Sequence, residues 1–336
     1  MDPVRLVSSR YDEHAKYDRP RRHTRPRTKD RPNYDDAETG RIITIDRGRY
    51  TVLVGEGDDE RTVMAMKSRN LGRKGVVVGD VARVVGDTSG TEDTLARIVE
   101  VEERRTVLRR SADDDDPIER IIVANAEQLV IVTALADPPP RPRLIDRCLV
   151  AAYDAGMEPL VCLTKADLAD PGELLELLRP LDVESIVTQH DQDPEVLRAR
   201  LRDRTSVMVG HSGVGKSTLV NALVPDAYRT TSHVNAITGR GRHTSTSAVA
   251  LRLPDGGWIV DTPGIRSFGL AHVQPSHLIR AFGDLEDASR DCSRGCTHAA
   301  TEPECALDTA VEAGELDRAR VDSFRRLLAS RDAADV

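Results

Sequence analysis

Nine consecutive residues have the composition and spacing of a glycine-rich phosphate-binding loop: Gly210, His211, Ser212, Gly213, Val214, Gly215, Lys216, Ser217 and Thr218. The apolar run at 206–209 predicts a buried strand before the loop, and residues 219–223 predict a helix after it. The glycines let successive N–H groups turn toward a phosphate, and the helix N-terminus adds its positive dipole end. Lys216 can then reach the β- and γ-phosphates, and the Ser217 hydroxyl can ligate Mg²⁺. The alternative is a turn without a ligand, which the flanking strand and helix disfavour.

A second candidate phosphate contact follows the strand predicted at 257–260. Asp261, Thr262, Pro263 and Gly264 form an Asp-x-x-Gly sequence. An aspartate at such a strand end can hold Mg²⁺ through water, and Gly264 can bring a backbone amide to a γ-phosphate. Alone, the pattern also fits a Pro-Gly turn after a buried strand, so its weight comes from the phosphate loop in the same domain.

A third motif, Thr164-Lys165-Ala166-Asp167, follows an apolar run that begins at Leu160. The carboxylate of Asp167 can accept two hydrogen bonds from the N1–H and N2–H₂ groups of guanine. Adenine offers no such pair of donors, so a buried Asp167 would reject it. The Lys165 stem can lie along the base. A strand-to-helix turn capped by aspartate is the alternative, but beside two phosphate motifs the sequence predicts a guanine nucleotide.

A cluster of potential metal ligands lies near the C-terminus, at Cys292, Cys296, His298 and Cys305. Three thiolates and an imidazole make a complete tetrahedral set for zinc, and four protein ligands indicate a structural ion rather than a catalytic one. In a reducing cytosol the cluster would not persist as disulfides. The alternative is chance clustering.

The part of the chain before these motifs contains five strand-like runs, at 41–45, 50–54, 61–66, 80–85 and 95–99. Glycine- and aspartate-rich turns separate most of them, which predicts a small β-barrel. An OB-type barrel is one such fold and commonly binds oligonucleotides. A barrel used only for packing or for protein contact fits the composition equally well.

Strands and helices alternate after the acidic residues 113–117, which predict a linker. Strands are expected at 128–133, 159–164, 183–187, 206–209, 248–253 and 257–260, and helices at 144–155, 171–178, 194–201 and after the phosphate loop. This alternation predicts a mostly parallel sheet covered on both faces. Cys148 and Cys162 lie in these apolar elements and are expected to be inert core residues. Residues 275–336 are expected to be helical around the Cys/His cluster.

The 336-residue chain has a formal net charge of −8, so as a whole it is no simple polyanion binder. Residues 1–36 lack a hydrophobic period and predict a disordered, basic tail, either solvated or lying on phosphates. Aromatic residues make up 3% of the chain, which argues against a base-stacking platform. The sequence shows neither a signal peptide nor a membrane-spanning run, which predicts a cytoplasmic protein with no membrane partner.

The order of the motifs is unusual, because the guanine motif follows the phosphate loop in most GTPases and precedes it here. A circular permutation can preserve such a site, because chain termini often lie close together. With a barrel before this domain and a Cys/His module after it, residues 40–310 resemble the circularly permuted GTPases of the RsgA (YjeQ) family, the small-ribosomal-subunit-dependent GTPases. The resemblance implies a role in late maturation of the small ribosomal subunit, which stimulates GTP hydrolysis.

The resemblance also implies roles for a first switch at residues 239–246. The family usually has a histidine followed by three threonines there; Ser245 departs from this, and Thr244 is favoured over Thr246 as the Mg²⁺ ligand. Ile265 is apolar and cannot orient water, so the family implicates His243 instead, with a structural loop histidine as the alternative. The pair Val187-Thr188 falls where the remaining base-side loop is expected. In the Cys/His cluster, the family's first gap is usually one residue longer.

These observations predict an α/β protein with a tail at 1–36, an OB-type barrel at 37–110, a circularly permuted GTPase domain at 111–274 and a helical zinc domain at 275–336. It is expected to hydrolyse GTP to GDP and phosphate as a monomer, with Mg²⁺ at the nucleotide, catalytic Lys216 and His243, and one structural Zn²⁺. The expected partners are the small ribosomal subunit and its rRNA. One rival is a P-loop ATPase or kinase, which Asp167 disfavours. The other is an RNA-binding barrel protein whose nucleotide site is only a structural prop.

Overall fold

A computed structural model describes residues 34–72, 75–111, 119–225, 248–262, 268, 270 and 273–332. The chain divides into two compact units, Met1–Asp35 and Asp36–Val336, and the fold described below is that of the second. All but the last residues of the predicted basic tail therefore lie outside the described part of the chain. No helix in the described part is long and apolar enough to cross a membrane.

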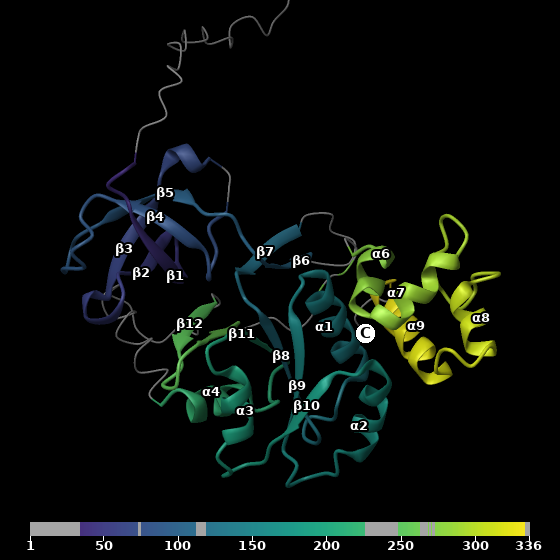
Figure 1. The fold of residues 1–336 in the computed structure, drawn as a ribbon. Helices are drawn as coiled ribbons and strands as arrows, with labels where there is room; N and C mark the ends of the chain where they lie inside the picture. The colour runs from purple at the N-terminus through teal and green to yellow at the C-terminus, as the bar shows by residue number, and fades with distance from the viewer. Residues whose placement is uncertain are drawn as a thin grey trace, which may run out of the picture. The chain divides into compact units, whose positions relative to one another are not determined.

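The first five strands close into the predicted barrel (Figure 1). They are β1 (Glu38–Asp46), β2 (Arg49–Val54), β3 (Arg61–Lys67), β4 (Val81–Val85) and β5 (Ala96–Val101). The order is β1-β2-β3-β5-β4, and β4 pairs again with β1, so no edge in this set is left open. Alternate residues such as Ile42, Val52 and Val63 point inward and are fully buried, as the period of a strand requires. The prediction of five strands is confirmed.

A second set of strands forms the predicted parallel sheet, in the order β10-β9-β8-β11-β13. Their bounds are β8 (Gln128–Ala134), β9 (Glu158–Thr164), β10 (Glu184–Val187), β11 (Thr205–Val209) and β13 (Trp258–Asp261), and β12 (Val249–Arg252) pairs antiparallel with β13. All seven residues of β8 are buried, because helices cover both faces.

Two pairs of helices cover the two faces of this sheet, α1 (Pro142–Asp154) with α2 (Gly172–Leu178), and α3 (Glu195–Leu201) with α4 (Lys216–Leu223) (Figure 1). The side chains of β8 alternate between two hydrophobic clusters. Leu129 and Ile131 pack with the first pair, and Val130 and Val132 pack with the second.

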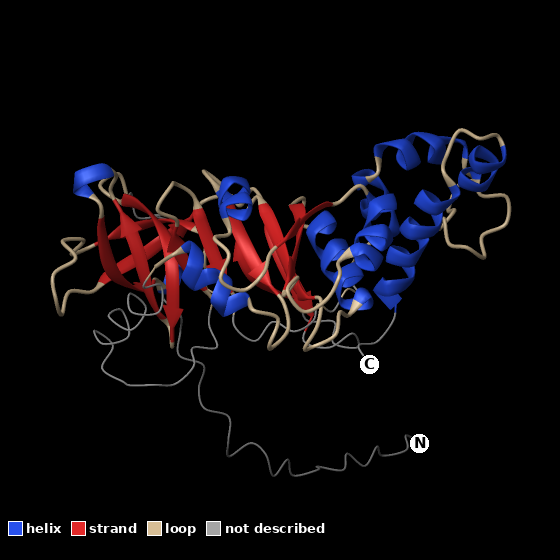
Figure 2. Cartoon of the chain, turned by 90° about the horizontal axis from the view of Figure 1, so that it is seen from below, coloured by secondary structure: helices blue, strands red, loops and turns tan. Residues whose placement is uncertain are grey.

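The C-terminal part carries α6 (Pro275–Leu278), α7 (Gly283–Ala288), α8 (Ala306–Glu312) and α9 (Arg318–Asp332), and residues 273–332 contain no strand (Figure 2). Five short 3₁₀ turns complete the described elements: η1 (Gly57–Asp59), η2 (Arg69–Leu71), η3 (Arg179–Leu181), η4 (Ile279–Ala281) and η5 (Ser289–Asp291). Helix α9 packs on α1, and Phe282 makes edge-to-face contacts with Tyr153 and Phe324 at centroid distances of 5.2 and 5.4 Å. The C-terminal helices thus share the hydrophobic core of α1 and α2.

One pair of strands, which the sequence did not predict, flanks the predicted linker at residues 113–117. β6 (Val107–Ser111) and β7 (Glu119–Ala124) pair antiparallel, and the acidic residues 113–117, outside the described part, lie between them in the chain. The boundary predicted between residues 110 and 111 therefore falls inside β6. The two strands are short and mix charged with apolar residues, so neither shows a clear alternation.

Candidate nucleotide and metal sites

Three of the sequence motifs meet at one edge of the parallel sheet. β9, β11 and β13 are parallel, with β8 between β9 and β11, and their carboxyl ends lead into Thr164, Gly210 and Asp261. In open α/β sheets this edge is where ligands bind. The guanine motif and the phosphate loop are therefore brought together although their order in the chain is reversed.

The phosphate loop requires glycine at defined positions. A Cβ atom on Gly210 would lie 2.5 Å from the carbonyl oxygen of Val132, so the loop passes too close to β8 for a larger residue. Gly213 and Gly215 have φ angles of +86° and +88°, which L-residues rarely adopt. The apolar Val214 is 1% exposed and anchors the loop. Ser212, Gly213, Ser217 and Thr218 are exposed around the start of α4.

Lys216 links the phosphate loop to the Asp-x-x-Gly motif at residues 261–264, which the family resemblance identifies as a second switch. Its Nζ forms an ion pair with Asp261 Oδ1 and lies 3.5 Å from the carbonyl oxygen of Thr262. The Lys216 and Asp261 side chains are 13% and 10% exposed, so the pair lies in a partly desolvated place. The Thr262 hydroxyl donates to the carbonyl of Met208 at 2.8 Å and fixes the end of β13 against β11. The two proposed phosphate contacts thus share one site.

The guanine motif is attached to the phosphate loop through Thr164. This residue is 5% exposed, and its hydroxyl donates to the carbonyl of Val214 at 2.6 Å. Lys165 Nζ donates to the carbonyl of Asp137. Asp167 is exposed in the structure, on the turn that follows β9. Its Oδ1 accepts a hydrogen bond of 3.3 Å from the backbone N–H of His190.

The base-side loop lies next to this motif, as expected for Val187-Thr188. The N–H of Thr188 donates to the carbonyl of Leu163 at 2.7 Å, and that of Ala166 donates to the carbonyl of Thr188 at 3.2 Å. The contact from His190 was not predicted, because it uses the backbone and carries no signal in residue type.

The His211 ring contacts the backbone of the phosphate loop on one side and is buried on the other. The imidazole Nδ1 lies 2.9 Å from the carbonyl of Ser212, and Nε2 is buried with no hydrogen-bond partner in the described part of the chain. The ring lines a cavity of about 10 Å³ together with Thr133, Ile145 and Phe268. The predicted site residues His243, Thr244 and Gly264 lie outside the described residues.

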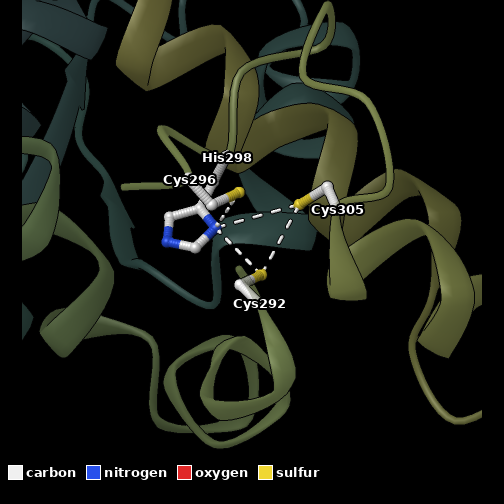
Figure 3. A group of neighbouring side chains, drawn as sticks. All are labelled: Cys292, Cys296, His298 and Cys305. Atoms are coloured by element: carbon white, nitrogen blue, oxygen red, sulfur yellow. Dashed lines mark hydrogen bonds between the residues drawn. The ribbon is translucent and has the colours of Figure 1, made fainter. Parts of the chain in front are cut away.

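The four candidate metal ligands converge in the C-terminal part (Figure 3). His298 Nδ1 lies 3.6, 3.5 and 3.8 Å from the sulfur atoms of Cys292, Cys296 and Cys305. The Cys292 and Cys305 sulfurs are 4.0 Å apart. A tetrahedral ion with Zn–S of about 2.3 Å and Zn–N of about 2.0 Å separates its ligand atoms by about 3.5–3.8 Å, so the cluster fits such an ion. All five cysteines of the chain are free.

The chemistry of the cluster also favours a cation. Burial, with the Cys292 and Cys305 thiols nearby, raises the pKa of the Cys296 thiol to about 12, so a thiolate there needs a positive ion beside it. Burial lowers the pKa of His298, which keeps the imidazole neutral and able to ligate. Arg325 of α9 braces the loop, because its Nε donates to the His298 carbonyl at 3.1 Å while its other nitrogens bind both oxygens of Asp308. The residues present can therefore hold one metal ion.

The fold and the order of its motifs define a circularly permuted P-loop GTPase. Two solved structures share the fold: "Crystal structure of YjeQ from Thermotoga maritima" (TM-score 0.65, 26% identity, 89% of this chain and 100% of that one) and "The crystal structure of YloQ, a circularly permuted GTPase" (TM-score 0.63, 24% identity, 90% and 97%). The family described as RsgA GTPase matches residues 101–271.

Curated relatives agree with this family match. A protein of Chlorobaculum parvum named "Small ribosomal subunit biogenesis GTPase RsgA" is 39% identical over 306 residues, which cover 88% of this chain and 98% of the relative. A Pseudomonas putida protein of the same name is 42% identical over 218 residues, 62% of this chain and 63% of the relative. The chain belongs to the RsgA GTPase family and is a GTP-hydrolysing enzyme. The ATPase or kinase reading is thereby set aside.

Proposed function

We propose that this GTPase acts in the late maturation of the small ribosomal subunit and that the subunit stimulates its hydrolysis of GTP. The observation that carries the enzymatic part is the meeting of Thr164, Gly210 and Asp261 at one edge of the sheet. The names of the relatives support the ribosomal part. The alternative is an RNA-binding protein in which bound nucleotide only stabilises the fold. That alternative predicts that the small subunit does not stimulate GTP hydrolysis.

We assign the phosphates to the loop around Gly213 and Gly215, with the Lys216 ammonium on the β- and γ-phosphates. The base lies against Lys165 beside Thr164, and Asp167 accepts from the edge of guanine. Gly264 supplies an amide to the γ-phosphate, and His243 orients the attacking water. Hydrolysis then consists mainly of positioning water and stabilising charge on the transferred phosphoryl group.

A magnesium ion suits the oxygen donors near the phosphate loop. The Ser217 hydroxyl is exposed on the first turn of α4, and the Asp261 carboxylate lies beside Lys216. We assign Ser217 and Thr244 as direct ligands and Asp261 as a ligand through water. When bound, the ion would neutralise charge on the β- and γ-phosphates.

Zinc is the metal we assign to Cys292, Cys296, His298 and Cys305, because three thiolates and one imidazole form a set typical of structural zinc. The ion would join the loop before α8 to the start of that helix. All four positions are filled by protein, so no reaction step passes through it. We also retain the proposed division into a tail (1–36), a barrel (37–110), a GTPase domain (111–274) and a zinc domain (275–336).

The barrel offers a candidate contact for rRNA. Arg49 pairs with Met66 across β2 and β3, and Met66 pairs with Arg97 across β3 and β5, so the three residues form one cross-strand row. All three are exposed, Met66 by 47%. Guanidinium groups at this spacing can contact phosphates. We propose a cytoplasmic monomer that binds the subunit through this row, with the basic tail as a further candidate contact.

The deciding experiment measures GTP turnover with and without purified small subunits. Stimulation by the small subunit, and not by an equal amount of large subunit, is the expected outcome. Equal turnover in all three samples would contradict the ribosomal part of the proposal, while absence of any GTP turnover would contradict the enzymatic part.

A further inference from the structure

Helix α1 presents two consecutive charged side chains to the core that it shares with α9. Asp146 is 3% exposed, and its Oδ2 accepts a hydrogen bond of 3.0 Å from Arg326 Nε. Arg147 is 2% exposed, and its guanidinium donates to two main-chain carbonyls. A buried donor that loses its acceptor costs free energy, so these two bonds resist displacement of either carbonyl.

The two carbonyls come from segments far apart in the chain. Arg147 donates to the carbonyl of Phe268 at 2.5 Å and to that of Ser330 at 2.9 Å. Ser330 lies in the last turn of α9, where carbonyls lack helical partners and carry partial negative charge. Phe268 stands four positions after Gly264, the end of the Asp-x-x-Gly motif. One side chain therefore joins the exit from the second switch to the C-terminal end of α9.

Phe268 also contacts the rear of the nucleotide site. It is 1% exposed and lines the small cavity behind the phosphate loop with Gly210 and His211. It belongs to the same hydrophobic cluster as Leu327 and Leu328 of α9. Phe268 thus lines the same cavity as the phosphate loop and is joined through Arg147 to α9.

We propose that Arg147 is a positioning residue that couples the phosphate site to α9. In GTPases the segment at this motif is held by the γ-phosphate and released when that phosphate is lost. Displacing the Phe268 carbonyl would break one of these two bonds and move the guanidinium, so a change at Phe268 is passed to Ser330. The C-terminal helical part thereby responds to whether GTP or GDP is bound. The inference rests on the proposed place of the γ-phosphate beside Lys216 and Asp261.

The test is backbone hydrogen exchange in α9 of the full chain, with GDP and with a non-hydrolysable GTP analogue. In the wild type, protection of the last turn of α9 should differ between the two nucleotides by at least about fivefold. Arg147→Met retains an unbranched apolar stem but no donors, and should reduce this difference below about twofold. Calorimetry on the same samples should show nucleotide affinities close to those of the wild type, because Arg147 does not touch the nucleotide.

Arg326→Met is the matched control, because Arg326 joins the same two helices through Asp146. Arg326→Met should lower the melting temperature but keep the nucleotide-dependent difference in protection. If the role of Arg147 were merely structural, the two variants would behave alike. If Arg147→Met does not fold, Arg147→Lys keeps the charge without the planar fork and should show a reduced difference. The proposal is overturned if the Arg147 variant keeps the full difference, if Arg326→Met loses it equally, or if the wild type binds both nucleotides and shows none. Failure to bind either nucleotide would instead contradict the proposed function, and the inference with it.

Discussion

Among single residues, Thr164 is the one that ties the two halves of the nucleotide site together. Its hydroxyl reaches the carbonyl of Val214, fifty positions away in the chain, inside the protein. The motif that contains Asp167, the proposed base-reading residue, is consequently held against the phosphate loop. Nucleotide affinity should depend on a residue that needs to contact neither base nor phosphate.

Thr164→Val should weaken GDP binding about tenfold, because valine has nearly the same shape and leaves the buried Val214 carbonyl without its donor, a loss of about 1–3 kcal/mol. Calorimetric titration with GDP measures the effect. Thr164→Ser retains the hydroxyl and serves as the control, with affinity close to that of the wild type. Unchanged affinity in the valine variant would show that the loop does not need this bond.

Asp167→Asn should shift preference from guanine toward xanthine nucleotides. The asparagine amide places a donor where guanine also offers one, whereas xanthine has a carbonyl oxygen there. Competition between GTP and XTP for the purified protein measures the shift. His190→Ala is the control, since His190 holds Asp167 through its backbone N–H, and it should keep the preference for guanine. Retained GTP preference in Asp167→Asn would remove Asp167 from the base site.

The sequence was sufficient to predict which motif residues lie at one site, but not the direction in which a side chain points or its burial. Lys216 and Asp261 could be predicted because each follows a buried strand at a fixed position in its motif. The burial of His211 Nε2, the backbone contact of His190 and the exposure of Asp167 could not. Each depends on how a loop packs against elements distant in the chain, which residue types and spacing do not encode.

The strands and helices of the GTPase domain were predictable because strongly apolar runs of strand length alternate with helical periods. Strands β6 and β7 were missed for the opposite reason. β6 has two arginines in five positions, and its stability comes from pairing with β7 beyond a run of aspartates. Such pairing is non-local, so neither strand can be identified from its own residues.

Cys296→Ser should remove the metal and destabilise α8 and the loop before it, because metal binding there contributes folding free energy. Metal analysis of the wild type should find one zinc per chain, and a strong chelator should lower the melting temperature. Cys148→Ser is the control, since Cys148 lies buried in α1 outside the cluster. Carefully prepared wild-type protein without zinc would contradict the assignment.

Acid should destabilise the barrel through Glu38. Its hydrogen bonds from the Thr88 hydroxyl and the Arg61 guanidinium, the latter at 2.6 Å, lower its pKa below the usual 4.5. The folded state therefore gains stability from this carboxylate above that pH, and loses it as the pH falls through the lowered folded-state pKa. The urea midpoint measured from pH 6 to pH 3 should fall less steeply for Glu38→Gln than for Glu100→Gln, which removes another carboxylate of the barrel. Equal slopes would contradict this role.

For the molecule as a whole, the exposed row on the barrel is the feature that should set its affinity for the subunit. Replacing Arg49 and Arg97 by Glu should weaken binding and flatten its salt dependence, because phosphate contacts release counterions. Sedimentation with small subunits at several salt concentrations measures both. Arg179→Glu with Arg290→Glu changes the net charge equally at two other exposed positions and is the control. If the two double variants weaken subunit binding equally, only the net charge of the protein matters and the row is not a specific contact.

The joint between α1 and α9 has a consequence for how the protein is made. Arg147 and Ser330 are separated by 183 positions, and Asp146 and Arg326 by 180. During translation α1 is synthesised long before α9. Asp146 and Arg147 of α1 therefore lack their partners in α9 while the rest of the sheet assembles. Contacts of such sequence separation form late and slowly. Docking of α9 is therefore expected to follow assembly of the sheet, and until it occurs α1 exposes a charged and apolar face to chaperones.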